Sequence, residues 1–349
     1  MMGENPLVAI SRYSDTAAST RVRVDNWLRY AGLPAERHNY LGTKNLGPKT
    51  LALRAHAIPQ AEFSLRRLAD RIGDRRVLIS RSASPFSNGG IEEKLLSRSD
   101  RGIYDFDDAI YASGSSRRSP FSSTASWERS VQAADVVIAG SDVLGERASA
   151  FSSDVRVIPS CIDSAQQTVK EDHSPGEVPR AVWLGSTSTE PHLVAVAAPL
   201  LRAHDQTGLR VSVISSGQAS LGPLDHMVDR IEWGLSTYQD ELIKADFGIM
   251  PLPDNEFTRG KCSYKLLEYG ASGLPVIGSG VGANVKALAL LHGLRADSSE
   301  QWCEALIDSA RASTADRQAR GSLAREGVRA HYDYACWTDT WLRAVGAST

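Results

Sequence analysis

The chain has 349 residues, a formal net charge of −2, and an ordinary composition of 42% hydrophobic and 23% charged residues. This length exceeds the size at which one hydrophobic core stops growing, so two domains are expected. The small net charge gives no argument for nucleic-acid binding, and no stretch approaches the ~18 apolar residues of a membrane span. The four cysteines lack metal-site spacing and residues 1–12 lack a signal-peptide pattern, so a cytoplasmic protein is expected.

The first predicted strand is the short apolar run Leu7–Ile10, and a loop of small polar residues follows it through Thr20. In an open α/β sheet the loop after the first strand lies at the carboxyl edge, where ligands bind. Ser19, Arg21 and Arg23 are therefore candidates to contact an acceptor or a phosphate. The alternative, that two exposed arginines simply begin a helix, stays open.

A basic amphipathic helix is predicted from Phe63 to Ile72, and further arginines follow up to Arg76. Such a helix can lie on an anionic membrane surface. More often it packs one face and solvates the other. A weak membrane-surface contact through Phe63–Arg76, peripheral to the inner face of the membrane, is one expectation, and simple packing is the other.

A second strand is predicted at Val77–Ile79. A third strand candidate, around Gly102–Phe106, ends in an acidic run that contains Asp105, Asp107 and Asp108. Hard divalent cations favour oxygen ligands, but no second acidic cluster completes a metal site. A further strand is predicted at 134–141. A polar stretch with two prolines then indicates an interdomain linker over residues 166–179.

Beyond the linker, the strand Arg180–Leu184 leads into the small residues Gly185, Ser186 and Thr187, which let a backbone approach a ligand closely. A turn without a ligand is the alternative. A further strand is predicted at 209–214.

The strongest pattern lies between residues 245 and 283, where a buried strand, a polar loop and a helix over Lys261–Gly270 are predicted. Lys261 and Lys265 would lie one turn apart on one helix face, close to the backbone N–H groups of the helix start. Glu268 follows one turn later. This arrangement fits a nucleotide diphosphate and its ribose, whereas a solvated amphipathic face is the open alternative.

The string GKCSYKLLEYGASGLPV, which begins at Gly260, resembles the donor-binding helix of family-4 glycosyltransferases of the GT-B fold. In that family the second Glu of a Glu-x7-Glu motif holds the donor ribose, and Glu268 matches it. The first Glu would fall at Gly260 and is absent, with Asp254 and Glu256 nearby as substitutes.

The segment YDFDDA, which begins at Tyr104, resembles the Y-D-x-D-D-A segment of a subgroup of the same family. This resemblance implies that Asp107 or Asp108 positions an acceptor hydroxyl or acts as a base, and that Asp105 is structural. It also implies that the loop at Gly185 reaches the donor phosphates. Trp233 or Tyr238 would stack in the nucleobase pocket, although aromatic residues at such spacing are more often core.

The prediction is an α/β protein with two Rossmann-like domains facing across a cleft, as in the GT-B fold. Residues 1–165 would bind the acceptor, residues 180–324 would bind the donor, and residues 325–349 would form a helix crossing back to the first domain. Sugar would pass from a nucleotide-diphosphate sugar, the co-substrate, to an acceptor hydroxyl, with retention, no cofactor and no metal. The acceptor, whether a carbohydrate, a lipid-linked glycan or a small metabolite, stays open. The predicted catalytic residues are Asp107, Asp108 and Lys261, and the predicted donor-binding residues are Gly185, Ser186, Thr187, Trp233, Tyr238, Lys261, Cys262, Ser263, Lys265 and Glu268.

Two other functions remain open. The stretch Gly278–Ala283 has the G-x-G-x-x-A form of a dinucleotide-binding turn, and Asp297 lies near the spacing of a ribose-binding acid, which favours an NAD(P)-dependent oxidoreductase. Against it, the turn comes late in the chain rather than in the first βαβ unit. A catalytically silent nucleotide-binding module is the other alternative, because the first motif Glu is missing.

Overall fold

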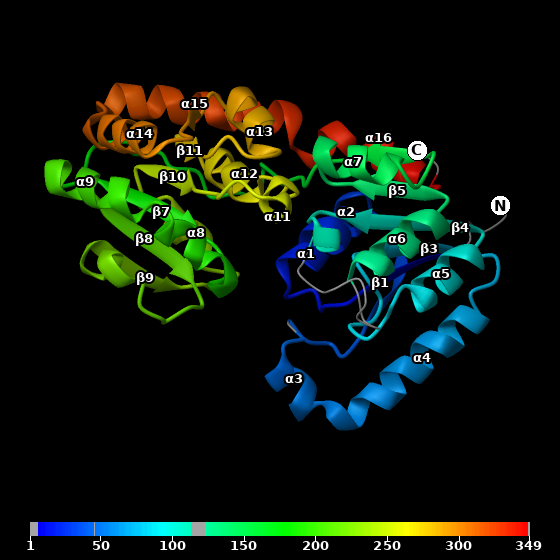
Figure 1. Cartoon of the computed structure of the whole chain (residues 1–349). Coiled ribbons are helices and arrows are strands. Elements are labelled where there is room, and N and C mark those ends of the chain that lie inside the picture. The colour runs from blue at the N-terminus through cyan, green and yellow to red at the C-terminus, as the bar shows by residue number, and fades with distance from the viewer. Residues whose placement is uncertain (1–5, 45, 113–122, 348–349) are drawn as a thin grey trace. The chain divides into compact units, whose positions relative to one another are not determined.

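The structure, a computed structural model, describes residues 6–44, 46–112 and 123–347 (Figure 1). The chain divides into two compact units. The first comprises Met1–Ser160, Gly260–Cys262 and Trp337–Thr349, and the second comprises Cys161–Arg259 and Ser263–Cys336. Each unit contains one parallel six-stranded sheet with helices on it. The predicted α/β class with two Rossmann-like units is confirmed.

The sheet of the first unit has the strand order β2-β1-β3-β4-β5-β6. Every residue of β1 and β3 is buried because helices cover both faces of the sheet. Strand β2 lies on one side of β1 and strand β3 on the other, so the strand order reverses between β1 and β3. Ligands of such sheets bind at the carboxyl ends of the strands at this point. The strands are β1 Leu7–Ser11, β2 Ala35–Asn39, β3 Arg76–Ser80, β4 Arg101–Phe106, β5 Val136–Ala139 and β6 Val155–Val157.

The helices of the first unit begin where local chemistry allows. Proline occupies the first turn of α3 and α4, where its missing N–H costs nothing, and the Ser141 side chain caps α7. The predicted loop through Thr20 ends early, because a helical run begins at Ala18. The helices are α1 Ala18–Thr20, a π-helical turn Arg21–Asp25, α2 Asn26–Tyr30, α3 Pro48–Leu53, α4 Ile58–Asp70, α5 Gly90–Ser97, α6 Ser123–Ala133 and α7 Asp142–Ser149.

The sheet of the second unit has the order β12-β11-β10-β7-β8-β9, the 3-2-1-4-5-6 arrangement of dinucleotide-binding folds. Strand β8 lies on one side of β7 and strand β10 on the other, so the strand order reverses between β7 and β10. Ligands of such sheets bind at the carboxyl ends of the strands at this point. The strands are β7 Arg180–Leu184, β8 Arg210–Ser215, β9 Val228–Glu232, β10 Phe247–Met250, β11 Val276–Gly278 and β12 Leu294–Arg295.

Two predicted helices differ from the structure. The helix predicted over Lys261–Gly270 begins at Tyr264, and the single tail helix predicted from Arg325 is divided into α15 and α16 near Asp333, which forms a bridge with Ile162. The last part of α16 belongs to the first unit, where Trp341 stacks on Trp27 with ring centroids 5.2 Å apart. The remaining helices are α8 Glu190–Val194, α9 Ala197–Thr207, α10 Tyr238–Leu242, α11 Glu256–Arg259, α12 Tyr264–Ala271, α13 Asn284–Leu290, α14 Ser299–Arg311, α15 Thr314–His331 and α16 Tyr334–Ala344.

Candidate functional site

The reversal point of the second sheet is filled by a tyrosine of α12. Strands β7 and β10 pair only through Ala181 and Val182, so the following backbone groups of the two strands need another partner. The Tyr269 hydroxyl accepts a hydrogen bond from the Leu184 amide at 2.8 Å and donates one to the Ile249 carbonyl at 3.3 Å. Its ring packs on Gly248, where an added Cβ would lie 2.2 Å from the Tyr269 ring. These contacts fix α12 at the carboxyl edge.

The N-terminus of α12 has the properties of an anion site. No side chain caps it, and Ser263 precedes it in a left-handed conformation with φ of 58°. The Ser263 side chain is buried, and its Oγ has no hydrogen-bond partner among the described residues. The first amides of a helix have no intrahelical partner and lie at the positive end of its dipole. An anion placed there would be stabilised.

The loop after β7 lies against the same helix through Trp183. The Lys265 ammonium lies 5.4 Å from the centre of the Trp183 ring. On the loop, an added Cβ at Gly185 would lie 2.4 Å from the ring of Trp183, so only glycine fits this turn. Ser186 and Thr187 are exposed. The predicted phosphate loop and the predicted donor helix therefore meet at one indole ring.

A buried glutamate, Glu190, connects the end of this loop to strands β8 and β9. Glu190 accepts hydrogen bonds from Ser215 Oγ at 2.6 Å and from Arg230 Nη1 at 3.0 Å. Gly217 lies directly against this carboxylate, since an added Cβ would lie 2.0 Å from a Glu190 oxygen. The loop after β7 is thus tied to the end of β8 by groups other than its exposed hydroxyls. Glu190 was not predicted, because it lies in a polar run with no distinctive spacing.

The remaining donor candidates of the second unit separate into two kinds. Glu268 is 5% exposed and lies on α12, three residues after Lys265. Trp233 is half-buried and stacks on Tyr238, with ring centroids 6.1 Å apart. Tyr238 itself is buried in the apolar core. Of the two aromatic residues, Trp233 is the more exposed.

Lys261 and Cys262 lie in a different place from the one predicted. Both belong to the first unit, where Lys261 Nζ lies 3.2 Å from Asp108 Oδ1 and the Cys262 thiol donates to the Asp107 carbonyl at 3.1 Å. The predicted shared helix face of Lys261 and Lys265 is wrong, because α12 begins at Tyr264 and contains Lys265 but not Lys261. Cys262 is buried, so its side chain is not a donor contact.

Asp107 and Asp108 are joined by an arginine that the sequence analysis did not single out. Arg81 Nε lies 2.7 Å from Asp107 Oδ1, and Arg81 Nη2 lies 2.7 Å from Asp108 Oδ2. Burial raises the pKa of Asp107, but the charge and hydrogen bond of Arg81 outweigh it and hold that pKa below its ordinary value. Asp107 is therefore suited to accept a hydrogen bond from a hydroxyl and is a weak base.

Arg81 has an unusual backbone conformation at this position. Its φ of 64° is uncommon for a residue with a side chain. Two hydrogen bonds hold this backbone. The Arg81 amide donates to the Asp105 carbonyl at 2.8 Å, and the Tyr104 hydroxyl donates to the Arg81 carbonyl at 2.6 Å. A left-handed arginine at a strand end leaves no signal in the sequence.

Arg23 is not an acceptor contact. It is 1% exposed, and its guanidinium donates to the buried Asp105 carboxylate at 2.5 Å and to the Ile158 carbonyl at 2.9 Å. Neither the predicted acceptor role nor the alternative of an exposed helix start is correct for Arg23. Asp105 is structural, as predicted. Ser19 and Arg21 are half-buried, and their predicted acceptor role stays a prediction.

The missing first motif Glu has a steric cause. A Cβ at Gly260 would lie 2.7 Å from the backbone nitrogen of Ala109 and 2.5 Å from its Cβ, so position 260 has no room for a side chain. Asp254 ion-pairs with Arg259, and both side chains are 57% exposed. Glu256 is exposed at the start of α11.

The turn at Gly278–Ala283 is occupied by its own protein contacts. The Gly280 amide donates to Asp297 Oδ1 at 2.6 Å, and Arg295 Nε lies 2.5 Å from the other carboxylate oxygen. Asp297 therefore holds the turn, which removes its predicted role as a ribose ligand. The turn also follows β11 and not β7, the first strand of its sheet.

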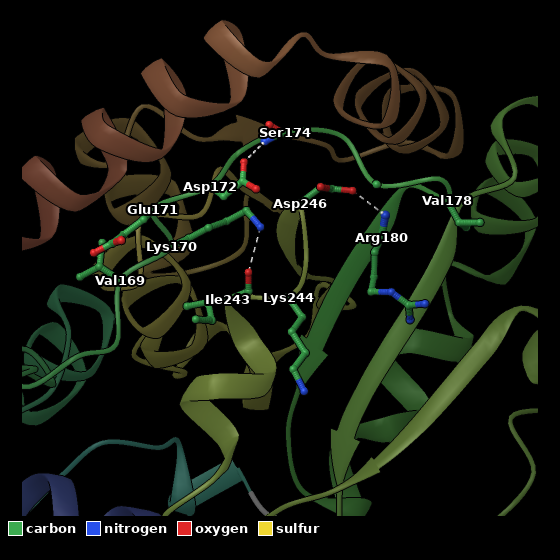
Figure 2. A pocket seen from close by; sticks show the side chains of 11 residues that line it. Val169, Lys170, Glu171, Asp172, Ser174, Val178, Arg180, Ile243, Lys244 and Asp246 are labelled. Carbon is green, nitrogen blue, oxygen red and sulfur yellow. Dashed lines mark hydrogen bonds between the residues drawn. The ribbon is translucent and has the colours of Figure 1, made fainter.

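A pocket of about 570 Å³ lies at the opposite edge of the second sheet (Figure 2). Arg180 begins β7 and Asp246 directly precedes β10, so the pocket is at the amino ends of these strands. Its Lys170 ammonium donates to the Ile243 carbonyl at 2.9 Å. None of the predicted site residues lines it. Within the described ranges there is no cluster of three metal-binding side chains, and no described helix is long and apolar enough to cross a bilayer.

No protein-family model matches the chain, and a search of curated proteins gives no match. Solved structures do match. Anabaena HepE in complex with UDP and glucose superposes with a TM-score of 0.70 at 12% identity, covering 98% of this chain and 100% of HepE. An α,α-trehalose-phosphate synthase (UDP-forming) from Burkholderia vietnamiensis gives 0.67 at 10% identity, covering 98% and 100%.

The fold is GT-B. S. aureus TarM, solved with UDP among its ligands, shares this fold with a TM-score of 0.60 at 11% identity. That match covers 81% of this chain and 58% of TarM, so the chain spans little more than half of TarM's length. Tyr269 therefore lies in the second of the two Rossmann-like sheets of this fold.

Proposed function

We propose that this protein is a glycosyltransferase that uses a nucleotide-diphosphate sugar. The observation that supports this most directly is the N-terminus of α12, which combines an uncapped helix start, the buried unpartnered Ser263 Oγ and the Lys265 ammonium at one sheet edge. These groups match the charge and hydrogen-bonding capacity of a diphosphate. The match to structures solved with UDP and UDP-glucose supports the same ligand class.

In the proposed reaction the bond between the sugar and the diphosphate breaks, a bond from the acceptor oxygen to the sugar forms, and the proton of the acceptor hydroxyl passes to the departing diphosphate. The N-terminus of α12 and Lys265 stabilise the negative charge that grows on the departing diphosphate, which is usually the largest catalytic contribution. Because these groups supply positive charge, we propose transfer without a metal ion. We also propose retention of configuration, which the family resemblance implies. Glu268 would hold the donor ribose, and Trp233 would stack on the base.

We assign acceptor binding to the first unit. Asp107 and Asp108, held by Arg81, would accept hydrogen bonds from an acceptor hydroxyl. Lys261 forms an ion pair with Asp108 at 3.2 Å. In this proposal Lys261 acts on the acceptor side through Asp108, and Lys265 acts on the donor.

Thermal unfolding with UDP, GDP, dTDP and NAD tests the proposal. A ligand that binds the folded state raises the melting temperature by mass action. One nucleoside diphosphate should raise it for wild type and for Lys244→Ala, an exposed control, and much less for Lys265→Ala. A shift with NAD alone contradicts the proposal.

Release of nucleoside diphosphate from the matching sugar donor then separates the transferase from a silent binding module. Slow release without acceptor, accelerated by a hydroxyl acceptor, is expected of the enzyme. Binding with no release under any acceptor supports the silent module, in which the loss of a Glu at position 260 abolished turnover.

A further inference from the structure

Helices α3 and α4 form an arm along the margin of the first unit (Figure 1). No residue of α3 is buried, and its Leu53 is 80% exposed. On α4, Phe63 is 59% exposed. Within the described ranges no other large apolar side chain is as exposed as these two. Exposed side chains of this size on one short segment call for an explanation beyond folding of the unit itself.

The inner side of α4 is fully used by the fold. Leu65, Leu68 and Ala69 are buried in the core of the first unit. Glu62 accepts hydrogen bonds from the Tyr40 hydroxyl at 2.7 Å and from Ser84 Oγ at 2.5 Å. Phe63 is therefore not a core residue that packs poorly. Residues three and four positions apart share a helix face, so Phe63 shares its exposed face with Arg66 and Arg67.

The charge on this arm is strongly positive at the surface. Arg67 lies over the Phe63 ring, 5.4 Å from its centre. The other exposed cations have no ion-pair partner in the part of the chain that the structure describes, and these are Lys49, Arg54, Arg66 and Arg71.

The acids of the arm do not neutralise these cations. Glu62 is engaged with Tyr40 and Ser84. Asp70 is held by Lys94 at 3.0 Å and by Arg98 at 2.7 Å. Between residues 48 and 72 the sequence has no other carboxylate. The surface therefore combines two projecting apolar side chains with cations that lack carboxylate partners.

We propose that this arm, residues 48–71, docks on the surface of an anionic lipid bilayer. Leu53 and Phe63 insert at the level of the headgroups, and the surrounding cations attract lipid phosphates. Charge complementarity selects this occupant, because the arm attracts anions along its length and has single projecting apolar side chains. A protein groove or a stacked dimer would bury a continuous apolar face.

The proposed surface ends earlier than the sequence pattern up to Arg76 indicated. Arg76 is 6% exposed and donates to the Val345 carbonyl at 3.3 Å, so it belongs to the interior of the first unit. Arg75 ion-pairs with Glu36 at 2.7 Å. The proposed surface also includes Leu53 of α3, which lies outside the helix predicted from the sequence.

Flotation of the full chain with lipid vesicles tests the proposal without any sugar donor. One set of vesicles contains phosphatidylcholine alone, and the other contains equal parts of phosphatidylcholine and phosphatidylglycerol. Wild type should float with the anionic vesicles at low salt and be released as salt screens the charges. The double variant Arg66→Gln/Arg67→Gln should lose about fivefold in partitioning for each cation removed.

Apolar insertion is tested separately. Phe63→Ser and Leu53→Ser should each reduce partitioning, whereas Leu323→Ser, a matched exposed leucine on α15, and Lys244→Gln should not. Unchanged melting temperatures show that the variants fold. Equal flotation with neutral vesicles, no flotation with anionic vesicles, or wild-type binding by the arm variants would each overturn the proposal, and none of these results bears on nucleotide binding.

Discussion

The carboxyl edges of the two sheets differ in how their charged groups are arranged. At the second sheet, the start of α12 has no side-chain cap, Ser263 Oγ has no described partner, and the Lys265 ammonium lies over an indole ring. At the first sheet, the strong charges neutralise one another, with Arg23 on Asp105 and Arg81 on both Asp107 and Asp108.

This difference assigns different ligands to the two edges. An edge with helix amides and an ammonium attracts an anion, and in the proposed function that anion is the diphosphate of the donor. An edge whose cations and carboxylates are already paired has little net attraction for phosphate. Its Asp107 and Asp108 carboxylates, held in place by Arg81, can still accept a hydrogen bond from a neutral hydroxyl.

The largest expected effect is on the buried pair of the first edge. Arg23→Met should lower the free energy of unfolding by about 3–5 kcal/mol, because it leaves the Asp105 carboxylate buried and unpaired. Chemical denaturation measures this loss. The double variant Arg23→Met/Asp105→Leu should recover much of it, since no buried charge remains. A single variant as stable as wild type would return Arg23 to the acceptor candidates.

Position 260 tests why the first motif Glu is absent. Gly260→Ala should cost about 1–3 kcal/mol of folding stability, because its Cβ would overlap the Ala109 backbone. Gly176→Ala, where the nearest atom to the added Cβ is 3.8 Å away, is the control and should be close to neutral. If Gly260→Glu folded with wild-type stability, the steric explanation would fail.

A matched pair of variants separates the charge of Arg81 from its strained backbone. Arg81→Ala and Arg81→Gly both remove the guanidinium, but only glycine adopts the left-handed φ of 64° without strain. Arg81→Gly should therefore be about 1 kcal/mol more stable than Arg81→Ala. Both should raise the pKa of Asp107, which NMR titration of the carboxylate can follow. Equal stability of the two variants would indicate that the backbone is not strained.

The smallest expected effect lies at the opposite edge of the second sheet. Hydrogen bonds from Arg210, opposed by partial burial and aided by Arg180, lower the pKa of Asp229 to about 2. A lowered folded pKa gives stability that is present above the ordinary value of 3.8 and lost as pH falls toward 2. Asp229→Asn should make acid unfolding less steep in that window, slightly, because the pair is partly exposed.

Much of the fold was predictable because its strands are buried. The runs at Leu7, Val77, Arg180 and Phe247 are apolar on both faces, as parallel strands between helix layers must be. β2 and β12 were missed for the converse reason. Both are edge strands with exposed residues, and β12 has only two residues.

The site was harder to predict because its contacts are distant in sequence. Arg23 resembles an exposed residue at a helix start until Asp105, 82 residues later, is placed beside it. The start of α12 was misplaced because Lys261 and Cys262 are helix-compatible residues that bind elsewhere, and Ser263 adopts a positive φ. Lys265 and Glu268 were correctly placed on one helix, since spacing along α12 is local information.

Hydrogen–deuterium exchange with and without the nucleoside diphosphate that shifts melting tests the central claim most directly. The account predicts slower exchange at the amides of residues 263–266 and of the loop 185–189, with no change at 280–284. Lys265→Ala should weaken this protection in proportion to its lost affinity, and Lys244→Ala should not. Protection confined to 280–284, or to the carboxyl edge of the first sheet, would contradict the assignment of the donor site to α12.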